Sequence, residues 1–367
     1  MDINDEKYME KAIDLALKAR GQTKTNPLVG AILVKNGKII GSGYHKKFGG
    51  PHAEEEAILS AGESVEGASL YVTLEPCSHQ GKRPACTDLI IKNKIAKVIV
   101  GSKDINPQVA GLKQLREAGI EVISGVLEKK CKEMNQVFFT TMKTQKPYLI
   151  LKTATSLDGK IASFSGDSKW ITGPEAREYG RSLRGQVDGI LVGINTVLKD
   201  DPSLTTRIKG LKDPIRLVAD SSLKIPLDAK IINQKSQATT YIFTTESCDK
   251  EKLKELRKKK DVQVFISGDD QGRVDLDKVM KICYEKNIAS ILVEGGGTIN
   301  YSVLEKGLVN KVYAFVAPSF IGGKKALTSV EGRGIDQVEN AYRFNFTRVE
   351  KLGNDLLLIG DSQCLQE

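Results

Sequence analysis

The chain has 367 residues, of which 40% are hydrophobic and 28% are charged, and its formal net charge is +9. A chain of this length is expected to form two domains, each with its own hydrophobic core. It contains no run of about 18 apolar residues and starts with the polar sequence MDINDEKYMEK, so we expect neither a membrane span nor a secretory leader. We therefore expect a cytoplasmic protein, in which cysteines stay reduced and disulfides are disfavoured.

The positive charge does not by itself indicate a nucleic-acid partner. It is scattered over both halves, and its densest run, KEKLKELRKKK at residues 250–260, interleaves Glu with Lys at helical spacing. Such a run is typical of a solvated helix face. We expect no nucleic acid to bind, whereas a phosphorylated small molecule would suit the same charge.

The first half predicts a mixed α/β domain. Apolar residues at helical spacing predict a helix over residues 6–20, and the Asn36-Gly37 turn predicts a hairpin between two apolar runs. Pro51 and Gly62 bound a second helix. The remaining elements alternate, with strands at 68–76, 97–102 and 121–126 and helices after Pro84 and at 112–119.

The second half predicts another α/β domain, with a mostly parallel sheet. The polar segment 131–147, which ends in TQKPY, places the boundary near residue 145. Thr172, Pro174 and Glu175 have the pattern of a capping box at a helix start. Gly353-Asn354 predicts a terminal hairpin. Strands are expected at 148–155, 188–193, 215–220, 239–245, 262–267, 289–294 and 311–318.

Two cysteines in the stretch LEPCSHQGKRPAC, residues 74–86, are candidate metal ligands. Cys77, Cys86 and the distant His52 make a Cys2His set, and a catalytic zinc needs three such ligands and one open position for water. His52 and Cys86 follow proline-marked helix starts, where helix N-termini favour thiolates. Glu54 would lie beside the metal without binding it, placed to take a proton from water.

Other interpretations of this stretch remain open at this stage. The pattern HAE followed by PC is similar to the zinc deaminase signature, but eight residues separate the two cysteines instead of two. His79 would be the fourth ligand of a structural Cys2His2 site, or it would contact substrate. Cys77 and Cys86 would alternatively be inert buried thiols. The other four cysteines show no ligand pattern.

Longer motifs resemble the bifunctional deaminase/reductase family of riboflavin biosynthesis. In the first half they are NPLVGAILV, GYHKKFGGPHAEEEAI, YVTLEPCSHQGKRPAC and NPQVAGLKQLREAGIEV. In the second half they are LKTATSLDGKIASFSGDSKWITG, ILVGINTVLKDDPSLTTR and VEGGGTIN. The resemblance implies a cytidine-deaminase-like three-layer domain at 1–145, followed by a dihydrofolate-reductase-like domain at 146–367.

The resemblance also implies a zinc-dependent hydrolytic deamination of a pyrimidine that carries a phosphoribosylamino group. His52, Cys77 and Cys86 match the zinc ligands, and Glu54 matches the proton shuttle. Four positions match the deaminase substrate pocket: Asn26, His45, His79 and Lys82. Local departures from the family pattern are Glu55, the RPAC segment and the DINPQVAGLKQL segment, none of which removes a ligand.

For the second half the resemblance implies reduction of the ribosyl group with NADPH. The segment ILVEGGGTIN has glycines where backbone N–H groups could approach a pyrophosphate, although a plain tight turn would look the same, and a G-x-G-x-x-G turn is lacking. The residues that match cofactor positions are Ala154, Trp170, Thr196, Asp200, Ser222, Gly295, Gly296 and Gly297. The substrate positions are Ser168, Arg184, Leu204, Arg207 and Glu294.

Several of these residues also have simpler interpretations. Arg184 and Arg207 suit a ribose phosphate, because a guanidinium offers paired donors, but either could form an ordinary ion pair. Trp170 could be a core residue, and Lys152 or Asp201 could supply a proton. The alternative function is a nucleoside or nucleic-acid base deaminase with an accessory α/β domain. We expect a small phosphorylated pyrimidine as substrate and a homo-oligomer.

Overall fold

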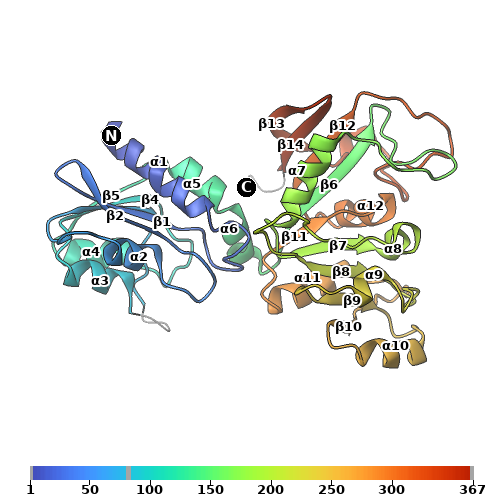
Figure 1. The fold of residues 1–367 in the computed structure, drawn as a ribbon, viewed down its shortest axis with the longest axis horizontal. Coiled ribbons are helices and arrows are strands. Elements are labelled where there is room, and N and C mark those ends of the chain that lie inside the picture. The colour runs from blue at the N-terminus through green and yellow to red at the C-terminus, as the bar shows by residue number, and fades with distance from the viewer. Residues whose placement is uncertain (1–2, 80–83, 364–367) are drawn as a thin grey trace. The chain divides into compact units, whose positions relative to one another are not determined.

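The computed structural model describes residues 3–79 and 84–363, and the chain divides into two compact units, Met1–Gln145 and Lys146–Glu367 (Figure 1). None of the described helices combines the length and apolar character needed to cross a membrane.

The first unit is built on one five-stranded sheet. Its elements are α1 (Ile3–Leu17), β1 (Gly30–Lys35), β2 (Lys38–Tyr44), α2 (Ala53–Leu59), β3 (Ser69–Leu74), α3 (Cys86–Lys92), β4 (Lys97–Ser102), α4 (Gly111–Glu117), β5 (Glu121–Ser124), α5 (Glu128–Met134) and α6 (Gln136–Thr144). The strand order is β2-β1-β3-β4-β5, with β1 antiparallel to both its neighbours and β3, β4 and β5 parallel. The predicted mixed sheet is confirmed.

Helices cover both faces of this sheet, because β1 sends alternate apolar side chains to opposite sides. Ala31 and Leu33 pack in a core with residues of α2, α3 and α4. Ile32 and Val34 pack in a second core with residues of α1 and α5. Figure 1 shows α1 and α5 over one face and α2, α3 and α4 over the other. The expected three-layer architecture is confirmed.

The β1–β2 hairpin turns where the sequence predicts it. Asn36 has φ of 50° and Gly37 has φ of 72°, the conformation that a two-residue turn between right-twisted strands requires. Neither residue type resists positive φ as a β-branched residue would.

The polar segment 131–147, from which the domain boundary was predicted, lies mostly in two helices that the sequence analysis did not predict. Cys131 and Met134 of α5 and Phe138 of α6 are buried. Between these helices, the side chain of Asn135 accepts a hydrogen bond from Leu28 N–H at 2.8 Å and donates to Leu28 O at 2.9 Å. A tertiary contact with the segment before β1 therefore holds this region.

The second unit is built on one nine-stranded sheet. Its elements are β6 (Tyr148–Ser156), α7 (Pro174–Arg184), β7 (Gly189–Gly193), α8 (Ile194–Asp200), β8 (Ile215–Ala219), α9 (Lys230–Asn233), β9 (Thr240–Thr244), α10 (Lys250–Arg257), β10 (Val262–Ile266), α11 (Leu276–Glu285), β11 (Ser290–Val293), α12 (Gly297–Glu305), β12 (Val309–Ala317), the 3₁₀ turn η1 (Val338–Asn340), β13 (Phe344–Leu352) and β14 (Asp355–Ser362).

This sheet is mostly parallel, as predicted. Its order is β10-β9-β8-β7-β11-β6-β12-β14-β13, and only the pairs that involve β14 are antiparallel. Ile190 and Val192 of β7 pack with α8, α9 and α10 on one face. Leu191 packs with α11 and α12 on the other face. The helices that follow β7 and β11 therefore lie on opposite faces of neighbouring strands.

The predicted capping box at the start of α7 is wrong. The N-cap residue is Gly173, Pro174 is the first helical residue, and no side chain caps the helix locally. Instead, Gly173 N–H donates to Asp355 Oδ2 at 2.6 Å, a residue of β14. The Asp355 carboxylate, which is distant in sequence, therefore binds a backbone N–H at the start of α7 in place of the predicted cap by Thr172 and Glu175.

Candidate functional site

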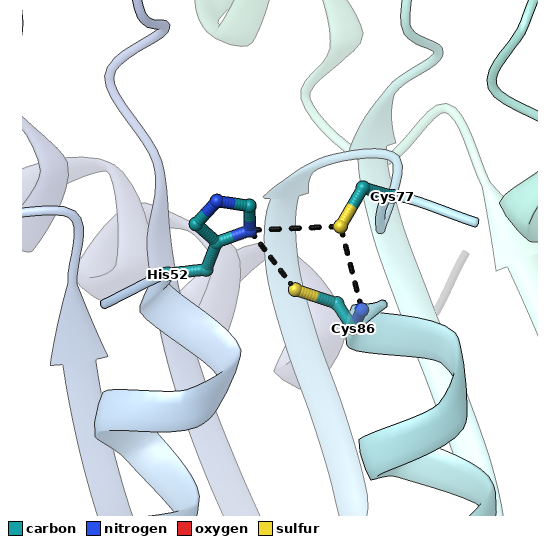
Figure 2. Close-up of side chains that lie close together, drawn as sticks. All are labelled: His52, Cys77 and Cys86. Carbon is teal, nitrogen blue, oxygen red and sulfur yellow. Dashed lines mark hydrogen bonds between the residues drawn. The ribbon is translucent and has the colours of Figure 1, made fainter. Parts of the chain in front are cut away.

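The ends of three elements bring His52, Cys77 and Cys86 together (Figure 2). His52 is the N-cap of α2, and Cys86 is the first residue of α3. Cys77 lies just beyond the end of β3, after Pro76. Each of the two helices therefore presents its N-terminus to the site, where its dipole favours a thiolate.

The three side chains have the spacing of ligands around one zinc ion. His52 Nδ1 lies 3.1 Å from Cys86 Sγ and 3.6 Å from Cys77 Sγ. Ligand atoms around a tetrahedral zinc lie about 3.6 Å apart, given Zn–S and Zn–N bonds of about 2.3 and 2.0 Å. Within residues 3–79 and 84–363 this is the group of His, Cys, Asp and Glu side chains that could hold a metal. Three ligands leave a fourth position open.

The charges of these side chains depend on one another. Hydrogen bonds from the Cys86 thiol and from His52 together lower the pKa of Cys77 to about 4. The same hydrogen bond raises the pKa of Cys86, and burial adds to the effect. The hydrogen bond to Cys77 raises the pKa of His52. The site therefore favours a thiolate at Cys77, and zinc binding would require Cys86 to lose its proton as well.

Glu54 lies beside these ligands but outside their set. It is the second residue of α2 and only 3% exposed. Burial raises its pKa, and its carboxyl is close enough to Cys86 to form a hydrogen bond. A buried carboxyl with a raised pKa next to a metal site is suited to accept and donate a proton near neutral pH.

His45 and Asn26 form one wall of the same site. His45 Nδ1 lies 2.8 Å from Pro51 O, which accepts only, so Nδ1 carries the proton and Nε2 accepts from Asn26 Nδ2 at 3.1 Å. Burial lowers the pKa of His45, which fits this neutral tautomer. The His45 and His52 rings meet edge to face with centroids 5.7 Å apart.

The other two predicted substrate residues are less constrained. His79 is exposed and does not belong to the group of possible ligands among the described residues, so a Cys2His2 site with His79 is not formed. Burial raises the pKa of Asp104, and His79 opposes this rise. Lys82 lies outside the described residues.

In the second unit, Glu294 is the centre of a buried charged cluster. Arg184 Nε and Nη2 donate to its two oxygens at 2.8 and 2.9 Å, and Lys152 Nζ lies 3.6 Å away. Burial alone would raise the pKa of Glu294, but Arg184 and Lys152 lower it to about 2. Arg184 Nη1 also donates to Thr205 O at 3.0 Å. The structure thus commits Arg184 to a buried ion pair instead of leaving its guanidinium free.

A cavity of about 290 Å³ opens at the carboxyl ends of β7, β8 and β11. This is where ligands bind in open α/β sheets, at the point where successive helices leave for opposite faces. Three of the predicted cofactor residues line it: Thr196, Ser222 and Gly296. Ala154 lies half-buried in β6, and Asp200 is exposed at the end of α8.

The three consecutive glycines have different physical roles. A Cβ on Gly295 would lie 1.8 Å from Ile299 Cγ2, and one on Gly297 would lie 2.5 Å from Glu331 Cγ. Those two glycines are needed for packing. Gly296 has nothing within 4 Å and is the N-cap of α12, so it leaves a helix N-terminus open to the cavity.

The structure places the remaining predicted residues as follows. Trp170 is 70% exposed, so it is not a core residue, and the Arg177 guanidinium lies 4.6 Å from its ring centroid. Arg207 is exposed, and its Nη2 donates to Ser203 Oγ at 2.7 Å. Leu204 is buried, and both it and Arg207 have positive φ. Ser168 is half-buried in the loop before α7.

Sequence reasoning missed several residues that line the cavity, among them Asn195, Asp220, Ser221, Lys224 and Arg273. The segment ADSSLK, which follows a buried strand with an acidic residue and two hydroxyls, was the available signal for three of them. No comparable local signal marked Arg273.

Comparison with known proteins matches both units. The RibD C-terminal domain model matches residues 147–358, and the cytidine and deoxycytidylate deaminase zinc-binding region matches residues 2–102. Riboflavin biosynthesis protein RibD of Actinobacillus pleuropneumoniae is 44% identical, over 97% of this chain and 95% of its own length. That of Aquifex aeolicus is 43% identical, over 96% and 97%.

A solved structure agrees over the full length. The diaminohydroxyphosphoribosylaminopyrimidine deaminase/5-amino-6-(5-phosphoribosylamino)uracil reductase of Thermotoga maritima is 36% identical, with a TM-score of 0.86, and the match covers 98% of this chain and 99% of that one. Because one relative matches both units in the same order, a base deaminase with an unrelated accessory domain is not supported. The expected cytidine-deaminase-like and dihydrofolate-reductase-like folds are confirmed. The chain belongs to the family of bifunctional riboflavin biosynthesis deaminase/reductases, with a zinc-binding deaminase domain followed by a reductase domain.

Proposed function

We propose that residues 1–145 hydrolyse the ring amino group of 2,5-diamino-6-ribosylamino-4(3H)-pyrimidinone 5′-phosphate, and that residues 146–367 then reduce its ribosyl group to ribityl with NADPH. The cluster of His52, Cys77 and Cys86 beside the buried Glu54 carries the first assignment. The relative from Thermotoga maritima is named for both of these half-reactions.

In the deaminase, His52, Cys77 and Cys86 would hold zinc, which supplies a Lewis acid that lowers the pKa of water. Glu54 takes a proton from the attacking water and passes it to the leaving amino nitrogen. The oxygen atom of water then remains on the ring carbon, and the amino group leaves as ammonia. The raised pKa of Glu54 favours holding that proton between the two transfers. Asn26, His45, His79 and Lys82 are proposed to bind the pyrimidine and its phosphate.

In the reductase, the cavity beside Thr196, Ser222 and Gly296 would hold the dinucleotide. NADPH supplies a hydride, and the protein must orient the C1′ carbon of the ribose and provide a proton. Lys152, held next to Glu294, is a candidate proton donor. Asp201 is a weaker candidate, because its carboxylate accepts from Lys230 N–H at 2.8 Å and pairs with the Lys230 ammonium at 3.3 Å. Ser168, Arg184, Leu204, Arg207 and Glu294 are proposed to contact the substrate.

We also propose a cytoplasmic location, because the zinc ligands Cys77 and Cys86 must stay reduced. A homo-oligomer is supported by the exposed apolar side chains Phe346 and Val349 on β13, which is an edge strand. Light scattering of the purified chain tests this second proposal, and a monomer at micromolar concentration would contradict it.

The Glu54→Gln variant tests the deaminase assignment. We expect it to keep one zinc per chain by metal analysis and to release ammonia from the pyrimidine at least about 100-fold more slowly, since general acid–base catalysis contributes about that much or more. Glu63→Gln, at an exposed carboxylate of the same unit, is the control. Retention of the wild-type rate with zinc bound would contradict the role of Glu54.

A further inference from the structure

Two cationic side chains stand on the rim of the cavity in the reductase unit. Lys224 and Arg273 line it together with the hydroxyl-bearing residues Ser221 and Ser222. One carboxylate, that of Asp220, also lines the cavity, but backbone N–H groups occupy both its oxygens. Arg273 Nε also donates to Asp269 Oδ2 at 3.3 Å within its own hairpin, so part of its charge is already paired. The rim therefore offers a lysine ammonium, a partly paired guanidinium and hydroxyl donors to a ligand, which is the chemistry of a phosphate subsite.

We propose that Arg273 and Lys224 bind the 2′-phosphate of NADPH and thereby make the reductase select NADPH over NADH. The inference rests on the proposed function, because it presumes that the cavity holds the dinucleotide. NADPH and NADH differ by this single phosphate. The proposal therefore makes Arg273 and Lys224, which were not among the predicted cofactor residues, responsible for distinguishing the two coenzymes.

The loop that carries Lys224 is held in one conformation. Asp220 is fully buried at the end of β8, and its two carboxylate oxygens accept from the N–H groups of Lys224 and Ile225, each at 2.8 Å. Within this turn, Leu223, which precedes Lys224, has φ of 57° and a buried side chain. Lys224 therefore leaves the turn at a fixed point on the cavity rim, and the position requires little reorganisation when an anion binds.

Arg273 comes from a separate segment that is docked on the same loop. Gly268 and Val274 form a bridge, and within this short hairpin Asp269 Oδ1 accepts from the N–H groups of Gln271 at 3.0 Å and Arg273 at 2.8 Å. Val274 N–H then donates to Ser221 Oγ at 3.1 Å. The Ser221 hydroxyl therefore holds the base of this hairpin against the loop that carries Lys224. As a result, Lys224 and Arg273 line the same cavity.

The rest of the cavity suits the other phosphates of a dinucleotide. Gly296 lines the same cavity as the N-cap of α12, which has nine residues, and it leaves the helix N-terminus with no Cβ in the way. A pyrophosphate is accommodated there by backbone N–H groups and the helix dipole. The 2′-phosphate lies at the adenosine end of the cofactor, away from the pyrophosphate, so a second, separate anionic subsite is what NADPH needs and NADH does not.

The substrate also carries a phosphate, so the source must be distinguished. The proposed substrate residues Arg184, Arg207 and Glu294 do not line this cavity. If the rim bound the substrate phosphate, ribose 5-phosphate would compete for it. If it binds the cofactor, adenosine 2′,5′-bisphosphate would bind and ribose 5-phosphate would not compete.

The test is calorimetric titration of the full chain with adenosine 2′,5′-bisphosphate and, separately, with AMP. We expect wild type to bind the bisphosphate at least about tenfold more tightly than AMP, equivalent to about 1.4 kcal/mol. Arg273→Gln and Lys224→Gln should each remove most of this preference, and Arg273→Lys should keep part of it. The expected preference should fall as salt is raised, because the Arg273 side chain is 67% exposed.

Arg257→Gln on the exposed face of α10 is the matched control, since it removes a surface guanidinium of the same unit away from the cavity. Unchanged preference in Arg273→Gln and Lys224→Gln, with wild-type thermal stability, would overturn the inference, and so would competition by ribose 5-phosphate. Failure of the proposed function has a different signature: wild type would then bind neither NADPH nor NADH.

Discussion

Replacing Glu294 with Gln tests the buried charged cluster of the reductase unit. The carboxylate is paired with Arg184 and Lys152, and its side chain is only 8% exposed. Its pKa is lowered from an ordinary value of 4.5 to about 2. At about 1.4 kcal/mol per pH unit, this lowering stabilises the fold by about 3 kcal/mol at pH 7.

The sign of the pH dependence follows from the same lowering. A carboxyl with a depressed pKa stabilises the folded state above its unfolded value near 4.5, and this contribution is lost as pH falls through about 2. At pH 3 about 1 kcal/mol of it should remain. The difference in free energy of unfolding between wild type and Glu294→Gln is therefore expected to shrink by about 2 kcal/mol between pH 7 and pH 3.

Urea unfolding at the two pH values measures this difference. Circular dichroism follows the full chain, and fluorescence of Trp170, the only tryptophan, assigns a transition to the second unit. Glu285→Gln, an exposed carboxylate at the end of α11, is the control and should stay within about 0.5 kcal/mol of wild type. A Glu294→Gln chain as stable as wild type at pH 7, or a difference that does not change with pH, would refute the reasoning.

Three further predictions concern the packing and the metal. Cys77→Ser should lower the zinc content below one per chain by metal analysis, whereas Cys248→Ser, which lies in the other unit, should not. Gly295→Ala should destabilise the chain by about 1–3 kcal/mol, because the added methyl would lie 1.8 Å from Ile299 Cγ2, while Gly296→Ala, with nothing within 4 Å, should unfold at nearly the wild-type urea concentration. Asn135→Ala should cost about 1–3 kcal/mol, because the buried N–H and C=O of Leu28 lose their partner; an unfolding midpoint equal to that of Asn93→Ala would contradict this.

The parts of the fold that could be predicted from sequence are those fixed by local chemistry. The Asn36-Gly37 turn needs positive φ at both positions, and these residue types announce it. Pro51 and Pro84 likewise announce the starts of α2 and α3, and with them the places where His52 and Cys86 lie. For that reason the sequence could place three ligands of one site although they come from three separate elements.

What sequence could not predict depends on partners that are distant along the chain. Asn135 gives no sign that it will bind both backbone groups of Leu28, so α5 and α6 resembled a linker. Thr172 and Glu175 have the pattern of a capping box, but they do not cap the helix. The Asp355 carboxylate accepts the hydrogen bond from Gly173 N–H instead. In both cases a tertiary hydrogen bond outweighs the local preference.

The cavity of the reductase unit shows the same limit where it affects specificity. In the sequence, the glycines after the strand at 289–294 indicated a phosphate-binding segment, because glycine allows the backbone to approach a phosphate closely. The segment ADSSLK offered a signal for Lys224, but nothing in the sequence indicated that Arg273 would lie beside it. The two residues lie in loops after different strands, and the parallel sheet and the Val274–Ser221 hydrogen bond bring them together. A surface arginine in a short hairpin looks like any other in sequence, so the residues that would separate two nearly identical cofactors are the ones for which a structure is needed.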